Sequence, residues 1–96
     1  MNDEYFNFDG NKFPIKRAIA LIDVGEHSEA FRVLSGTHSH MSPHTLGAVA
    51  AASSHPDIEK YQILDSAVVK ARDLVGSDPR GARLELLSML DTFGWA

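Results

Sequence analysis

Apolar residues recur at helical spacing from residue 14 onward. Four of them fall at i, i+3, i+4 and i+7, the pattern of one buried helix face: Ile15, Ala18, Ile19 and Ile22. Pro14 suits the first turn of a helix, and Gly25 is typical of the residue that follows a helix end. The pattern predicts a first helix over residues 14 to about 25.

A second helix is expected after a short turn at residues 25–27. Its apolar face consists of Ala30, Phe31, Val33 and Leu34. The pair Ser35-Gly36 is a stop signal. So short a turn makes the two helices antiparallel neighbours. Residues 36–44 then form a predicted polar loop, which carries three of the five histidines.

A third helix is predicted over residues 43–53. Ser42 fits its N-cap and Pro43 its first residue. Most of its side chains are small, so that neighbouring helix backbones can approach it closely. We therefore expect it to be the central and most buried helix.

Two further helices have clear end signals. Ser54 and Asp57 stand at capping-box spacing. They precede an apolar stripe that continues to Gly76: Ile58, Tyr61, Leu64, Val68, Ala71 and Val75. Asp78-Pro79 starts the last helix, which Gly94 closes. Its inward face consists of Ala82, Leu86, Leu87, Leu90 and Phe93. These elements predict an all-α fold, either a compact five-helix bundle or a short stack of helical hairpins.

The first thirteen residues differ in composition, being aromatic and acidic. Asp9-Gly10 is a hairpin signal, so residues 5–8 could pair with residues 11–13. The alternative is an extended arm whose phenyl rings pack on the helices, because an isolated hairpin is marginally stable. The domain assignment is an N-terminal arm at residues 1–13 and a single helical domain at residues 14–96.

Composition narrows the function classes. The chain has 96 residues, no cysteine and a net charge of −4, which disfavours disulfides, thiol chemistry and non-specific nucleic-acid binding. The N-terminus is acidic where a secretory signal is basic. The longest apolar stretch, residues 46–52, is far shorter than the roughly 20 residues that span a bilayer. We expect a soluble cytoplasmic protein with no membrane contact.

One segment, residues 18–34, resembles the helix–turn–helix unit of tetratricopeptide repeats. The matching positions are Ala18, Leu21, Gly25-Glu26, Glu29-Ala30 and Leu34. The family's pattern is not met at Pro14, Arg17, Thr37 and Pro43, and no second copy follows at the repeat period. The resemblance implies a repeat-like hairpin in a non-repeating domain, with protein or peptide binding and no catalysis.

Three histidines, His38, His40 and His44, lie within the predicted loop. His38 and His40 would point the same way if the loop were extended, as a metal site requires. The loop lacks HExxH spacing and an adjacent carboxylate, so we assign no metal ligands and keep a histidine-loop metal site as a third alternative. Because histidine titrates near pH 6.5, the same three residues are candidates for a pH-sensitive loop.

A helix-turn-helix DNA-binding regulator is the second alternative. Residues 42–46 would open its recognition helix, with His44 and Thr45 towards the bases. Residues 46–52 carry no basic or amide side chain to contact DNA. No glycine-rich phosphate loop, Gly-x-Ser-x-Gly elbow or thiol is present, so neither an enzyme nor a cofactor is predicted.

The last two predicted helices each carry a second apolar face, which favours a protein interface. The candidate interface residues are Ile63, Ala67, Leu74, Leu84, Met89 and Trp95. Trp95 fits equally well as an interface anchor or as a lid on the bundle. The sequence predicts a small non-enzymatic interaction protein that docks as a homo-oligomer or on a protein partner. It would act as an adaptor, chaperone or inhibitor, as bacterial and phage accessory proteins do.

Overall fold

The computed structural model describes residues 8–46 and 58–96. Over these residues the chain forms one 3-10 helix, η2 (Phe8–Asn11), and four α-helices, with no strand. The α-helices are α1 (Lys12–Asp23), α2 (His27–Leu46), α4 (Ile58–Leu74) and α5 (Pro79–Thr92). The all-α class is confirmed, whereas the count of five helices is not matched.

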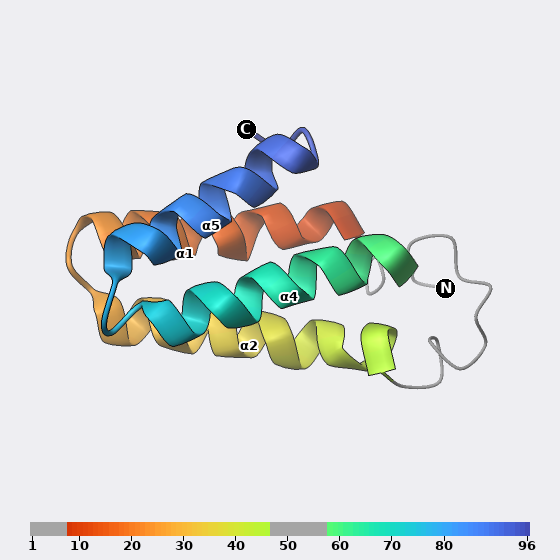
Figure 1. Cartoon of the computed structure of the whole chain (residues 1–96), viewed down its shortest axis with the longest axis horizontal. Coiled ribbons are helices and arrows are strands. Elements are labelled where there is room, and N and C mark those ends of the chain that lie inside the picture. The colour runs from red at the N-terminus through yellow and green to blue at the C-terminus, as the bar shows by residue number, and fades with distance from the viewer. Residues whose placement is uncertain (1–7, 47–57) are drawn as a thin grey trace.

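Two antiparallel hairpins, α1–α2 and α4–α5, pack together as a bundle (Figure 1). α2 lies against α4 and α1 against α5, and both tight turns are at the same end of the bundle. Two contacts define the antiparallel register of α2 and α4: Phe31 with Arg72, and His38 with Asp65. From the first contact to the second, the chain advances by seven residues along α2 and goes back by seven along α4, as antiparallel helices require.

Local signals set most of the helix ends. Gly25 has a φ of 82°, and the N–H of Glu26 donates to the Leu21 carbonyl at 2.8 Å, which closes α1. The Asp78 side chain accepts from the N–H of Gly81 at 3.1 Å and so caps α5, as Asp78-Pro79 predicts. Gly94 follows α5 with a φ of 70°.

The predicted end of the second helix at Ser35-Gly36 is wrong, because α2 continues to Leu46. Its apolar stripe extends past Leu34 to Thr37 and Met41, which are 5% and 0% exposed. Packing of these two residues outweighs the roughly 1 kcal/mol that a glycine costs inside a helix. The predicted loop at residues 36–44 is therefore helical. The third helix predicted at residues 43–53 shares its first four residues with α2, and the rest lies outside the described residues.

Of the two alternatives for residues 5–13, the hairpin is not formed where the structure describes the chain. Residues 8–11 form η2 and α1 begins at Lys12, two residues before the predicted start. Asn11 closes the 3-10 turn by donating its side-chain N–H to the Phe8 carbonyl at 2.9 Å. Residues 5–7 lie outside the described part.

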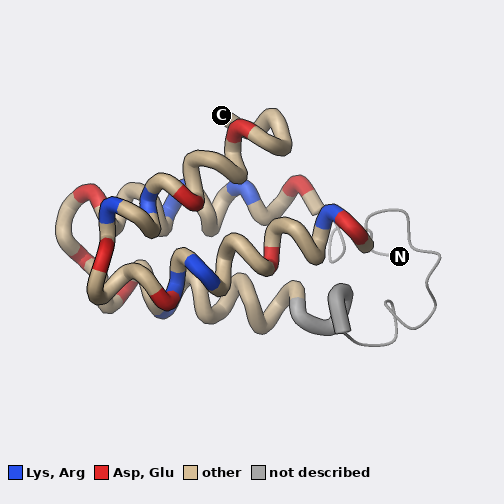
Figure 2. The backbone as a smooth tube through the Cα atoms, in the orientation of Figure 1, with Lys and Arg blue, Asp and Glu red and all other residues tan. Residues whose placement is uncertain are grey.

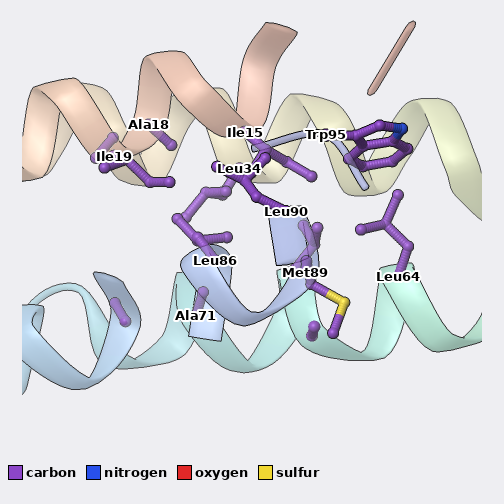
Figure 3. Close-up of a cluster of buried hydrophobic side chains, with 14 of the residues drawn as sticks. Ile15, Ala18, Ile19, Leu34, Leu64, Ala71, Leu86, Met89, Leu90 and Trp95 are labelled. Carbon is purple, nitrogen blue, oxygen red and sulfur yellow. The ribbon is translucent and has the colours of Figure 1, made fainter. Parts of the chain in front are cut away.

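The core lies between the four helices and draws on each of them (Figure 3). Fully buried members include Ile15 from α1, Leu34 from α2, Leu64 from α4 and Leu86 from α5. At the end opposite the tight turns, Phe8 packs against the rings of Tyr61, Phe93 and Trp95, with centroids 4.9–5.2 Å apart. These four rings are called the aromatic cluster below.

Candidate functional site

A solvent-open groove of about 540 Å³ lies between the start of α2 and the end of α4. We call it the Phe31 groove. Its lining residues are His27, Ser28, Phe31, Arg32, Ser35, Val75 and Gly76. Phe31 is 48% exposed, although the sequence predicts it on the buried face. The stripe that α2 buries follows Ala30 and Leu34, which leaves Phe31 at the edge of the helix interface.

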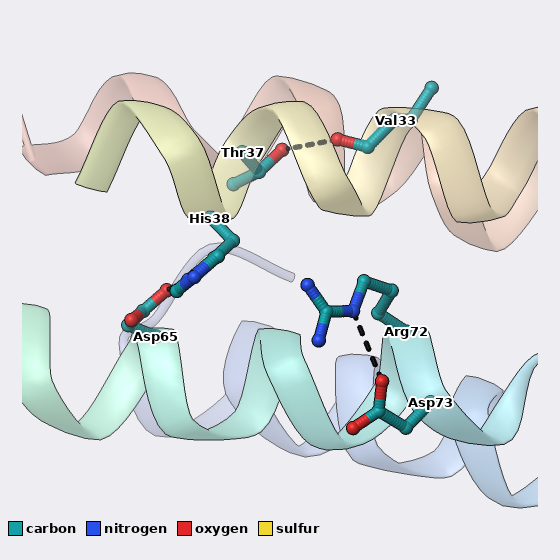
Figure 4. Close-up of polar contacts among 6 residues, drawn as sticks. All are labelled: Val33, Thr37, His38, Asp65, Arg72 and Asp73. Carbon is teal, nitrogen blue, oxygen red and sulfur yellow. Dashed lines mark hydrogen bonds and ion pairs between the residues drawn. The ribbon is translucent and has the colours of Figure 1, made fainter. Parts of the chain in front are cut away.

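Charges border the Phe31 groove without filling it. The Arg72 guanidinium carbon lies 6.0 Å from the Phe31 ring centroid, at cation–π distance, while Arg72 Nε donates to Asp73 at 3.1 Å (Figure 4). Arg32 is 3.7 Å from Glu29 and largely exposed. The groove therefore offers an aromatic surface with paired charges at its rim, which suits an apolar side chain of a partner.

Nucleophilic catalysis needs a serine within hydrogen-bond reach of a base. Ser28, Ser35 and His27 all line the Phe31 groove, yet among the described side chains no hydrogen bond joins either serine to the histidine.

A second, smaller depression of about 400 Å³ lies between η2, the start of α1 and the middle of α2. We call it the Gly36 notch. Its lining residues are Gly10, Asn11, Pro14, Val33, Gly36, Thr37 and His40. Asn11 and Thr37 are 6% and 5% exposed, and Thr37 donates its hydroxyl to the Val33 carbonyl at 2.8 Å (Figure 4). No sequence motif predicts this notch, because its walls come together only in the folded hairpin.

The predicted histidine loop is distributed over two faces of a helix. His38 Nδ1 lies 2.7 Å from Asp65 Oδ1 across the α2–α4 interface, and Asp65 is 8% exposed (Figure 4). His40 lines the Gly36 notch, because residues two apart on a helix point in widely different directions. The side chain of His44 lies outside the described part. Within residues 8–46 and 58–96 no three His, Asp or Glu side chains gather as a metal site.

The helix-turn-helix alternative requires a turn between Gly36 and Ser42. α2 runs through these residues without interruption, so the expected recognition helix does not begin there. Where the structure describes the chain, no helix has both the length and the apolar character to span a bilayer.

The six predicted interface residues have different environments. Ala67 and Met89 are buried at 7% and 9% exposure, and Leu74 packs partly buried against the core, so their apolar surface is used within the chain. Ile63 and Leu84 remain 45% and 60% exposed. The second apolar faces of α4 and α5 thus mostly complete the core, because each helix contacts two neighbours.

Trp95 packs at one end of the bundle, which is the position of the lid, one of the two alternatives for this residue. It is 7% exposed, contacts Phe8 and Phe93, and donates its indole N–H to Asp9 Oδ1 at 3.1 Å. This hydrogen bond joins the C-terminal tail to η2 across the end of the bundle.

A scan against models of known families finds no match for the chain, and searches among curated proteins and solved structures find none either. The functional assignment therefore depends on the two depressions and their side chains.

Proposed function

We propose that this chain is a non-enzymatic docking protein that binds an apolar segment of a protein partner in the Phe31 groove. The observation that carries the proposal is the half-exposed Phe31 ring, which lines the groove and lies at cation–π distance from Arg72. Aromatic residues, phenylalanine among them, and arginine are both enriched in protein interfaces relative to the rest of the surface.

The helical hairpin below the groove adds support. Ala18 of α1 and Ala30 of α2 are both 0% exposed, so small side chains fill the interface of this hairpin. These are two of the positions that resemble the tetratricopeptide-repeat unit, a family that binds peptides. We extend the proposal to a peptide-like partner on that resemblance.

The proposal is tested by affinity capture from the source cells with wild-type bait, Phe31→Ser bait and Leu84→Ser bait. Leu84 is the matched control, because it is also apolar and exposed but lies outside the groove. A captured partner is then purified and titrated against each variant by calorimetry. We expect Phe31→Ser to weaken binding by about tenfold or more, the size of a hot-spot loss, and Leu84→Ser to change it less than about twofold.

A partner that binds the Phe31→Ser variant as tightly as the wild type contradicts the groove assignment. If no partner is captured and catalytic turnover of a substrate is found, the docking function itself is wrong.

A further inference from the structure

The outer face of α1 carries apolar side chains that the fold leaves uncovered. α1 packs against α2 and α5, and its buried residues are Ile15, Ala18, Ile19 and Ile22. Phe13 and Val24 lie on the opposite side and are 66% and 72% exposed. In the described part of the chain five large apolar side chains are exposed, and two of them lie on this face.

The exposed residues of this face follow the spacing of helix–helix packing. Four of them are separated in turn by four, three and four residues: Phe13, Arg17, Ala20 and Val24. We call these four residues the α1 seam. The same spacing lets one helix pack along another, with the side chains of each entering the spaces of its partner. Ala20 is small and exposed, so a second helix can approach closely between Phe13 and Val24.

The charges on this face are basic. From Lys12 to Ile22 the chain has three basic residues and no acid (Figure 2). Arg17 lies within the α1 seam, whereas Lys16 shares a helix face with Asp23, which pairs with Arg83 of α5 at 2.6 Å. Lys16 therefore lies at the edge of the seam nearer to α5. The Asp23–Arg83 pair already neutralises the one acid that α1 contains.

The fold makes no ionic use of these cations. Among the described residues no carboxylate lies within ion-pair distance of Lys16 or Arg17. By contrast, four other cations lie within 3.7 Å of a described carboxylate: Arg32, Lys70, Arg72 and Arg83. Nor does the helix dipole favour them, because acids stabilise the start of a helix and the first turn of α1 has none. The basic residues of α1 are thus available to an external anion.

Charge complementarity specifies the chemistry of the partner. The chain as a whole has a net charge of −4, so its basic face is a local exception. A second copy that met this face with its own α1 would bring like charges together. An extended anionic surface, such as a bilayer or a nucleic acid, would repel the acidic remainder of the chain. A single acidic helix places its carboxylates on α1 alone and supplies apolar side chains for Phe13 and Val24.

We propose that the α1 seam binds an acidic amphipathic helix of a protein partner. The apolar side chains of that helix pack against Phe13, Ala20 and Val24. One of its carboxylates accepts hydrogen bonds from the Arg17 guanidinium, and another pairs with Lys16. This surface is separate from the Phe31 groove, which lies between α2 and α4. Either proposal can therefore fail alone.

Fluorescence anisotropy with a designed peptide tests the α1 seam. The probe is a labelled helical peptide of about three heptads, with leucine on one face and glutamate along both edges. The matched control peptide has lysine in place of each glutamate. We expect the wild-type chain to bind the glutamate peptide at least about tenfold more tightly than the lysine peptide, because like charges across an interface are strongly unfavourable.

Two variants locate the binding surface. Phe13→Ser and Arg17→Glu should each weaken binding of the glutamate peptide by about tenfold or more. Leu84→Ser and Arg80→Glu are the matched controls, because they make the same changes at exposed positions of α5. Both controls should stay within about twofold of the wild type. Arg17→Glu should also bind the lysine peptide more tightly than the wild type does. Circular dichroism checks that each variant is folded.

Four outcomes overturn the proposal. The first is a glutamate peptide that binds no more tightly than the lysine peptide, or binds Arg17→Glu as well as the wild type. The second is loss of binding in Phe31→Ser, because the peptide would then occupy the Phe31 groove. The third is Arg17-dependent binding to phosphatidylglycerol vesicles without peptide binding, which assigns the face to lipid. The fourth is Arg17-dependent self-association in sedimentation equilibrium without peptide binding, which assigns it to a second copy. The Phe31 capture experiment decides the docking function in each case.

Discussion

Aromatic side chains are buried at one end of the bundle and half exposed at the other. At the end away from the tight turns, Phe8, Tyr61 and Trp95 are 2–7% exposed and pack ring against ring. At the turn end, Phe31 is 48% exposed and its ring contact is with Arg72. The interface of α2 and α4 connects these ends, with the His38–Asp65 pair two turns from Phe31.

This difference in exposure depends on which segments of the chain are available to cover each end. η2 precedes α1 and the tail follows α5, and the Trp95–Asp9 hydrogen bond joins them over the aromatic cluster. At the other end both connections are tight turns, and no described segment crosses the α2–α4 interface (Figure 1). Exposure of an aromatic residue is thus decided by chain connectivity as well as by hydrophobicity.

The largest effect is expected at the covered end. Trp95→Ala removes a buried ring and its hydrogen bond to Asp9, and should lower the free energy of unfolding by about 3 kcal/mol, as for other large-to-small changes in a core. Urea unfolding followed by circular dichroism measures it. Trp95→Phe keeps the ring packing and should lose about 1 kcal/mol, the value of one hydrogen bond. A loss below about 1 kcal/mol for Trp95→Ala would show that the tail does not cover this end.

The next effect lies along the α2–α4 interface. His38→Ala leaves the nearly buried Asp65 carboxylate without this partner, which should lower the free energy of unfolding by about 2 kcal/mol. A double-mutant cycle with Asp65→Ala measures the coupling, and the double variant should be more stable than the sum of the single losses implies. Strict additivity would mean that the pair contributes nothing as a pair.

How much of this could be predicted from the sequence depends on how local the signals are. Asp78, Pro79 and Gly94 bound α5 through contacts within a few residues, so its ends were predictable. Ser35-Gly36 is an equally local stop signal, yet Thr37 and Met41 are buried by distant helices, and the stop is overridden. The continuation of the stripe from Leu34 to Met41, seven residues apart, is the signal that could have predicted the longer helix.

The candidate sites were harder to predict from the sequence than the helix ends. The Phe31 groove joins residues about 45 positions apart, and only the pairing of α2 with α4 brings them together. His38 and His40 were grouped by their closeness in sequence, whereas the helix directs one to Asp65 and the other to the notch. For Ile63 and Leu84 the helical period alone was enough, because it places both residues on a second helix face. Both side chains are exposed in the structure.

Equal truncations at the two ends sharpen the comparison. Phe31→Ala should cost about 1 kcal/mol, because a half-exposed ring gives up about half of the transfer free energy of a buried one. Phe8→Ala should cost about 3 kcal/mol, since Phe8 is 6% exposed and contacts three rings. Thermal and urea unfolding of both variants measure the difference. Equal losses would mean that the two ends are packed alike.

The smallest effect is a gain in stability, at Gly36, midway between the two ends. Gly36→Ala should raise the free energy of unfolding by roughly 0.5 kcal/mol, because alanine restricts the unfolded chain and its Cβ meets no atom within 4 Å. Gly25→Ala at the turn end is the matched control. It should lower stability by about 1 kcal/mol, because a φ of 82° strains any residue with a side chain. Both are measured by urea unfolding at concentrations where the chain is monomeric, so that a change in self-association does not contribute. A loss of stability for Gly36→Ala would show that the fold itself requires a glycine at this position.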